Sequence, residues 1–152
     1  MKKYSAIVDI VDGERRVVSF RRINSVQELD EEVSKAYEAS KRFYVSNPKA
    51  PSVLSCCRYY NENDALDCEI IKTAPVMLLE AKEFAEGKRL QPRLDCEDFS
   101  NAEGAYLTVV KKRLTLPYIF PSPYSNMLHC FLQYQDDKSF YDPSLDAGMD
   151  KP

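Results

Sequence analysis

Residues 54–60, LSCCRYY, contain two adjacent cysteines, Cys56 and Cys57, followed by a cation, Arg58, and two tyrosines. Thiols beside a positive charge could form a nucleophilic or redox site, because the charge favours the reactive thiolate. The alternating pattern instead predicts a β-strand, in which successive side chains point to opposite faces. We therefore expect Cys56 and Cys57 to diverge, with Cys56 the better candidate for a reactive thiol.

A second alternating run, ALDCEIIK at residues 65–72, follows the turn-favouring residues 61–64. Pairing the two runs as a hairpin places Cys57 opposite Cys68 and Cys56 opposite Glu69. Directly opposed strand residues lie within disulfide reach, although buried thiols more often pack as small apolar side chains. The chain has five cysteines and no export signal, which favours reduced thiols.

His129 is the only histidine, so a cysteine–histidine dyad would have to pair it with Cys56 or Cys130. The cysteines and His129 lack the short-spaced pairs typical of zinc sites. The hydrolase motifs G-x-S-x-G and H-E-x-x-H are absent, as are the P-loop and dinucleotide-binding glycine patterns, and the chain has only four glycines. We expect no metal site and no cofactor, and the sequence does not favour an enzyme.

Basic residues occur in short runs, Arg15-Arg16, Arg21-Arg22 and Lys111-Lys112-Arg113. Strand geometry sends adjacent side chains to opposite faces, so only part of each run could contribute to one phosphate-binding surface. The net charge of −3 also provides no general attraction for a polyanion. Binding of nucleic acid is therefore an alternative rather than the main expectation.

Acidic and aromatic side chains point to a different chemistry, the binding of a protein partner. Acidic groups gather in the first half of a predicted helix and in a predicted turn, where they could attract a basic surface. Aromatic groups occur in the stiff, proline-rich stretch LPYIFPSPY, and rigid aromatics favour the centres of interfaces. The residues that we expect to contact a partner are Glu28, Asp30, Glu31, Glu32, Asp136, Asp137, Tyr118, Phe120 and Tyr124.

The elements that carry these residues begin with a hairpin and a long helix. Asp12-Gly13 between two β-rich runs predicts a two-residue turn, which places Asp9 opposite Arg16. Ser25 and Glu28 form a capping-box pattern at the start of a helix over residues 26–44. Its acidic first half also complements the helix dipole.

Further along, Thr73, Pro75 and Gly87 mark the ends of a second helix. The sequence then predicts a loop over residues 91–104, a strand over 105–120 that is broken by Pro117, a second strand at 126–135 and a turn at 136–138.

These elements predict an α+β fold in which an antiparallel sheet of two or three hairpins, in the order ββαββα and then further strands, carries two helices on one face. We expect one compact domain over residues 1–141 and a mobile tail over residues 142–152, which has few apolar residues. The N-terminus does not resemble a secretory signal and no stretch is apolar enough for a membrane span, so we expect a cytoplasmic protein.

The function that the sequence favours is binding and inhibiting, or neutralising, a protein with a basic surface. An inhibitor, a toxin-immunity factor and a phage anti-defence protein are examples of this class. A thiol enzyme or redox protein using Cys56 or Cys130 with His129 stays open, as does nucleic-acid binding by the hairpin arginines. A second copy of the chain also stays open as a partner.

Overall fold

The computed structural model describes residues 2–61, 67–121 and 128–150, and in these residues the chain forms two small β-sheets and four α-helices. In chain order the elements are β1 (Tyr4–Val11), β2 (Glu14–Arg22), α1 (Val26–Ser46), the short 3₁₀ helix η1 (Val53–Ser55), β3 (Cys68–Lys72), α2 (Ala74–Ala85), α3 (Cys96–Val109), β4 (Thr115–Pro121), β5 (Leu128–Tyr134), β6 (Phe140–Tyr141) and α4 (Pro143–Asp146).

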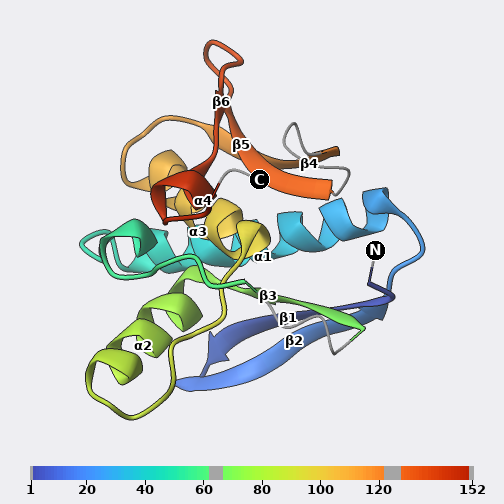
Figure 1. Ribbon diagram of the computed structural model, residues 1–152. Helices are drawn as coiled ribbons and strands as arrows, with labels where there is room; N and C mark the ends of the chain where they lie inside the picture. The colour runs from blue at the N-terminus through green and yellow to red at the C-terminus, as the bar shows by residue number, and fades with distance from the viewer. Residues whose placement is uncertain (1, 62–66, 122–127, 151–152) are drawn as a thin grey trace.

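The two sheets enclose a layer of helices (Figure 1). One sheet has the strand order β2-β1-β3 and the other has the order β4-β5-β6. Figure 1 shows α1 and α3 between the lower sheet and the upper one, with α2 beside the lower sheet. The α+β class is therefore confirmed, but the expectation of one antiparallel sheet with helices on one face is wrong. Both sheets are small, so each needs the helix layer to cover its apolar side.

β1 and β2 form the predicted hairpin, with Asp12 and Gly13 as its turn. Both turn residues have positive φ, 52° and 80°, as the tight turns that match strand twist require. The predicted pairing of Asp9 with Arg16 is confirmed. Between Ile7 and Val8 of β1 the register shifts by one residue, because β2 contains an extra residue, Val18, which strand alternation alone does not reveal.

The first predicted helix is confirmed as α1, which continues two residues beyond the predicted end. The hydroxyl oxygen of Ser25 accepts a hydrogen bond from the backbone N–H of Glu28 at 3.2 Å. The Glu28 carboxylate accepts from the N–H of Asn24, one residue earlier than a capping box requires. Leu29, Val33 and other apolar residues at helical spacing form its buried face.

The predicted hairpin of residues 53–60 with 65–72 is wrong. β3 pairs in parallel with β1, so that Cys68 lies opposite Tyr4 and Glu69 lies opposite Ser5. The first run contains η1 and then a loop, from which Tyr60 forms an isolated bridge to Leu94. The part of the predicted turn at residues 62–64 lies outside the described residues.

The alternation of apolar and polar residues in LSCCRYY results from the packing of a loop on the core rather than from a β-strand. Cys57 is buried in the main apolar cluster. The N–H of Tyr59 donates to the carbonyl of Ala147 at 2.9 Å, so its hydrogen bond goes to the C-terminal segment. A loop that packs one side on a core shows the same apolar–polar pattern as a strand at a sheet surface.

α2 has the predicted boundaries, with Thr73 before it, Pro75 in its first turn and Gly87 after its end at φ 74°. The Thr73 hydroxyl does not cap the helix but donates to Oδ1 of Asp9 at 2.7 Å. This contact joins the start of α2 to β1.

α3 occupies residues predicted as a loop and as the beginning of a strand, and both predictions are wrong. Asp95 is its N-cap, and Oδ2 of Asp98 accepts from the N–H of Asp95 at 2.9 Å. Gly104, the last residue of the predicted loop, lies where α3 passes close to β5. A Cβ at this position would lie 2.9 Å from Cδ2 of Leu132. The glycine therefore permits close packing of the helix on the sheet.

The second sheet contains β4 and β5 in antiparallel pairing, with β6 at its edge. β5 confirms the strand predicted at residues 126–135, within its described part. Pro117 lies inside β4, which is an edge strand and so tolerates the missing N–H. The predicted turn is present between β5 and β6, with Lys138 at φ 62°.

The C-terminal segment contains α4 within its described part. A side-chain oxygen of Asp142 accepts from the N–H of Ser144 at 3.1 Å and caps this short helix. Ala147 after it is buried in the main apolar cluster. The mobility expected of residues 142–152 stays a prediction.

Two buried apolar clusters stabilise the layers. One includes Tyr44 and Phe99, and the other includes Ile7, Val33 and Cys130. α1 and α3 contribute residues to both clusters, which makes the described chain a single compact unit. Among the described helices, none combines the length and the apolar character needed to cross a membrane.

Candidate functional site

The acidic residues predicted to bind a partner from α1 are largely engaged within the chain. Glu28, Glu31 and Glu32 form ion pairs with Arg21 of β2, at 3.3, 3.0 and 3.4 Å. Glu32 is fully buried and also accepts from the hydroxyl of Ser19 at 3.0 Å. These contacts stabilise the packing of α1 on β2 and reduce the charge that a partner would meet.

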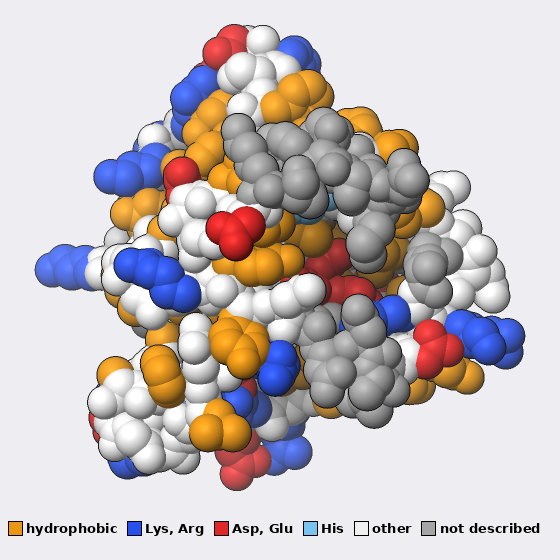
Figure 2. Space-filling view, viewed as in Figure 1, with side chains coloured by type: hydrophobic (Ala, Val, Ile, Leu, Met, Phe, Trp, Pro, Cys, Tyr) orange, Lys and Arg blue, Asp and Glu red, His pale blue; other side chains and the backbone are white. Residues whose placement is uncertain are grey.

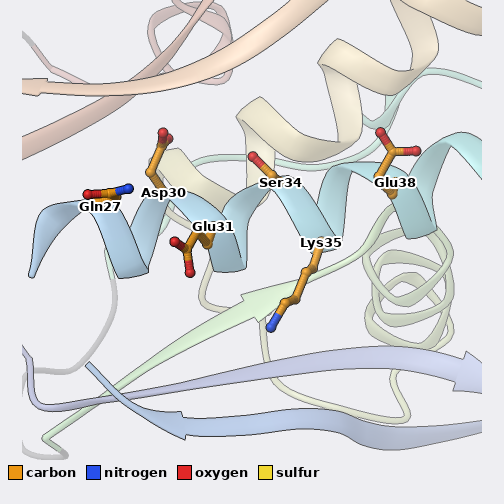
Figure 3. A pocket seen from close by; sticks show the side chains of 6 residues that line it. All are labelled: Gln27, Asp30, Glu31, Ser34, Lys35 and Glu38. Atoms are coloured by element: carbon orange, nitrogen blue, oxygen red, sulfur yellow. The ribbon is translucent and has the colours of Figure 1, made fainter. Parts of the chain in front are cut away.

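Asp30 and Glu31 contribute to an open groove of about 390 Å³ on the surface of α1 (Figure 3). Partial burial, followed by the charge of Glu31, raises the pKa of Asp30. The groove is lined by Gln27, Asp30, Glu31, Ser34, Lys35 and Glu38. Three carboxyl groups and one ammonium give it an acidic character that suits a basic ligand.

Asp136 and Asp137 lie in the predicted turn, beside a cation. Asp136 accepts two hydrogen bonds from the guanidinium of Arg113, at 2.9 and 3.2 Å. Asp137 lies 3.4 Å from the same group. Arg113 also lies over the ring of Tyr134, 3.5 Å from its centroid. The turn therefore presents two carboxylates and a guanidinium together.

Tyr118 and Phe120 of β4 belong to a group of contacting aromatic rings. Phe120 lies 5.2 Å from Phe131 and 5.8 Å from Phe140, and Tyr118 lies 5.9 Å from Phe120, between ring centroids. Strand alternation places these residues on the side of the sheet opposite the buried Cys130 and Leu132. We call Tyr118, Phe120, Phe131 and Phe140 the aromatic face. Tyr124, predicted with them, lies outside the described residues.

The structure brings Cys56 and Cys57 together, contrary to the strand prediction. Their Sγ atoms are 3.8 Å apart, because the backbone of Cys56, at φ −138° and ψ −10°, is not extended as in a strand. A hydrogen bond from the Cys57 thiol lowers the pKa of Cys56 to about 6, with smaller help from Ser55 and Arg58 and with burial opposing it. The same contact and burial raise the pKa of Cys57. Cys56 is exposed and its neighbour is buried.

Cys130 and His129 point to opposite sides of β5 and do not form a dyad. Burial and the charge of Glu97 raise the pKa of Cys130 well above its ordinary value. Nε2 of His129 lies 2.7 Å from Oδ2 of Asp142, and its ring stacks on Phe131. The geometry therefore gives no support to Cys130 as a nucleophile.

Three of the four hairpin arginines predicted for nucleic acid, Arg15, Arg16 and Arg21, are accompanied by carboxylates. Arg15 lies 3.1 Å from Glu80 and 2.7 Å from Glu83, both on α2. Arg16 pairs with Glu14, and Arg21 pairs with α1 as described above. These pairs reduce the positive charge that the hairpin could offer to phosphates.

An unpredicted cluster of three carboxyl groups lies between β3 and the start of α3. Glu69, Asp95 and Glu97 each place an oxygen within 4.8 Å of the other two. Burial, followed by the charge of Glu69, raises the pKa of Glu97 to about 8. Nζ of Lys2 lies 3.9 Å from Oε2 of Glu69. Figure 2 shows acidic side chains recessed near the middle of the face that it presents.

The sequence contained only a weak signal for this cluster. Asp95 and Glu97 are close in the chain, but the sequence predicts a loop for them and places Glu69 in a hairpin that does not form. Only the packing of α3 against β3 brings the three together.

No protein-family model, curated protein or solved structure matches this chain. The function therefore has to be inferred from geometry.

Proposed function

We propose that the chain is a small non-enzymatic cytoplasmic protein that binds a protein partner and thereby inhibits or neutralises it. The aromatic face carries this proposal. Phe140 is 57% exposed, and Tyr118, Phe120 and Phe131 are half-buried against one another. Contiguous aromatic groups on a surface favour association, because their burial removes a large apolar area from water.

The aromatic face suits an interface because its rings are already ordered. Each ring contacts at least one other, and strands β4, β5 and β6 hold their backbones in one sheet. Association therefore costs little side-chain entropy, which is the usual reason that aromatic residues dominate interface energies.

The groove on α1 favours a partner with a basic surface, whereas pairing with Arg113 reduces the negative charge of the turn at Asp136 and Asp137. Glu38, which is exposed and also pairs with Lys41 at 3.0 Å, and Asp30 contribute carboxyl groups to the groove, whereas Glu28 and Glu32 support the fold through Arg21. Glu32→Lys would place a buried ammonium group beside the guanidinium of Arg21 and destabilise the fold. Glu32 is therefore unsuitable for testing the partner surface.

A thiol-dependent function at Cys56 is the second candidate, since Cys57 lies within reach of its sulfur and lowers its pKa. It would use the two adjacent thiols rather than the predicted partner, His129. Nothing comparable favours nucleic-acid binding, because Arg15, Arg16 and Arg21 of the hairpin are paired with carboxylates.

The test begins with the tagged chain immobilised and exposed to a lysate of the source cells, followed by purification of any stoichiometric partner. Calorimetry then compares wild type with the double variant Phe120→Ala/Phe140→Ala. We expect the affinity to fall at least about 10-fold, as for residues at the centre of an interface.

Phe84→Ala provides the matched control, because Phe84 is 46% exposed but lies on α2. We expect this variant to bind like wild type, and we expect Glu38→Lys to weaken binding more at low salt than at high salt. The absence of a stoichiometric partner, or equal binding by the double variant and wild type, would refute the proposal.

A further inference from the structure

We propose that Cys56 and Cys57 form a reversible redox site, in which a peroxide oxidises the two adjacent thiols to a disulfide between them. The site rests on the second candidate function, the thiol chemistry of Cys56, and is independent of the partner and of the aromatic face. Cys56 reacts with the peroxide, and Cys57 then completes the bridge.

The backbone after η1 brings the two sulfur atoms together. The N–H groups of Cys56 and Cys57 both donate to the carbonyl of Val53, at 3.3 and 2.8 Å. The chain therefore turns at Cys56 and leaves the extended conformation in which adjacent side chains point to opposite faces. The Sγ atoms lie 3.8 Å apart, and a disulfide needs about 2.05 Å, so the remaining approach is less than about 2 Å.

The two thiols differ in exposure, which gives each one a role. Cys56 is exposed, whereas Cys57 is 2% exposed and packs in the main apolar cluster. A dissolved peroxide therefore reaches the sulfur of Cys56 but not that of Cys57. Sγ of Cys57 lies 3.7 Å from the carbonyl oxygen of Met77, so the side chain is held between α2 and Cys56. An accessible sulfur beside a protected one is the arrangement of a reacting cysteine and the cysteine that resolves it.

Arg58 holds a positive charge close to Cys56. Its guanidinium donates to the carbonyls of Leu54 and Cys57, at 3.3 and 3.1 Å, which folds the side chain back over the loop. The hydrogen bond from Cys57 and, more weakly, Ser55 and this charge lower the pKa of Cys56 against the opposing effect of burial. The thiolate that these contacts favour is the form that attacks a peroxide.

The oxidation proceeds in two balanced steps. The Cys56 thiolate attacks one oxygen of the peroxide, so that an S–O bond forms and the O–O bond breaks, and the departing oxygen takes a proton and leaves as water or an alcohol. Cys56 is then a sulfenic acid. The sulfur of Cys57 attacks the sulfur of Cys56, an S–S bond forms, the S–O bond breaks, and the hydroxyl group leaves as water with the thiol proton of Cys57. The two thiols together lose two electrons, which reduce the peroxide.

The position of the two cysteines next to each other makes the bridge easy to reduce. The Cα atoms of neighbouring residues are about 3.8 Å apart, which is shorter than the about 4.4–6.8 Å usual for disulfides. The bridge is therefore strained, and strained or exposed bridges are the labile ones. A small thiol such as glutathione attacks the exposed sulfur of Cys56 and releases Cys57, and a second thiol then releases Cys56 as the two small thiols become a disulfide.

The test treats the full, reduced chain with about one equivalent of hydrogen peroxide at neutral pH, blocks the remaining thiols with iodoacetamide and digests the chain with trypsin. Cleavage after Lys49 and Arg58 gives the peptide of residues 50–58, which contains Cys56 and Cys57 and no other cysteine. We expect mass spectrometry to find this peptide about 2 Da lighter than its reduced form, and glutathione to restore both thiols.

The rate of oxidation supplies a comparison within the same chain. Cys96 and Cys130 are buried, and burial raises the pKa of each thiol well above its ordinary value. We expect the bridge in residues 50–58 to form at least about 10-fold faster than either of these cysteines is oxidised. Equal rates at all three positions would overturn the proposal, because they would show no selectivity for the pair.

Other products of the wild-type chain would also overturn the proposal. A sulfinic acid at Cys56 beside an unreacted Cys57 would show a reactive thiol without a bridge, and the second candidate function would then stand without this site. A disulfide that joins residues 50–58 to another peptide would assign a different resolving cysteine. An unchanged peptide in excess peroxide would show that Cys56 does not react. None of these outcomes bears on the protein partner, which the aromatic variants test separately.

Cys57→Ser and Cys68→Ser form a matched pair of variants. Each replaces one thiol by a hydroxyl group, but Cys68 lies on β3, in the other part of the chain's thiol set. We expect Cys57→Ser to form no bridge and to accumulate sulfinic acid at Cys56, and Cys68→Ser to form the bridge like wild type. Loss of the bridge in both variants would overturn the assignment of Cys57. The wild-type measurement decides the proposal if Cys57→Ser does not fold.

Discussion

At the scale of single residues, local geometry changes the chemistry of Cys56. The thiol of Cys57 donates to its sulfur over 3.8 Å, which lowers the pKa of Cys56 to about 6. Cys56 is consequently a thiolate at pH 7, since this pH lies above its pKa, and it becomes protonated as the pH falls below about 6. The thiolate is the reactive form of cysteine.

We predict that alkylation of Cys56 by iodoacetamide has a rate that rises with pH and reaches half of its maximum near pH 6. Cys57→Ala removes the hydrogen-bond donor and should move this midpoint toward the ordinary value of about 8.5. Cys57→Ser retains a donor and should keep the midpoint low. Mass spectrometry of the alkylated peptide measures the rate, and an unchanged midpoint in Cys57→Ala would contradict the assigned cause.

At the scale of elements, sequence patterns succeeded where the signals were local. The Asp12-Gly13 turn, the Ser25 cap of α1 and the Thr73–Gly87 limits of α2 each depend on a few neighbouring residues. The loop predicted over residues 91–104 conceals most of α3, and Gly104 at the end of this range is explained by the tertiary packing of the helix. The pairing of β3 with β1 is not predicted, because parallel strands are joined by a long crossover connection rather than by a short turn that the sequence would reveal.

The close approach of α3 to β5 predicts the effect of Gly104→Ala. Alanine favours a helix by about 1 kcal/mol over glycine. The added methyl group would lie 2.9 Å from Cδ2 of the fully buried Leu132, and overpacking of this kind costs about 1–3 kcal/mol. We therefore expect the free energy of unfolding, measured with urea, to fall by about 1 kcal/mol in net terms.

The double variant Gly104→Ala/Leu132→Val provides the control for this explanation. Valine at 132 leaves space that the new methyl group fills, so the double variant should lose less stability than the sum of the single variants. We expect a difference of at least about 0.5 kcal/mol. Additive losses would show that the contact with Leu132 is not the cause.

At the scale of the whole molecule, the carboxyl cluster and the aromatic face depend on contacts that no short pattern contains. The residues of the carboxyl cluster come from β3 and the start of α3, and the aromatic face comes from three strands. The sequence indicated Tyr118 and Phe120 but not Phe131 or Phe140, because those positions become neighbours only through strand pairing. It also could not show that Arg21 engages Glu28, Glu31 and Glu32.

The shared helix layer predicts that both sheets unfold together. α1 and α3 contribute to both apolar clusters, so neither sheet can lose its cover without exposing residues that pack against the other. Leu132→Ala on β5 and Ile71→Ala on β3 each shorten a fully buried side chain, which costs about 2–5 kcal/mol. Each variant should lower the hydrogen-exchange protection of the most protected amides in β1 and in β5 by the same free energy. If Leu132→Ala weakened protection in β5 but left β1 unchanged, the two sheets would be separate cooperative units and the layer would not couple them.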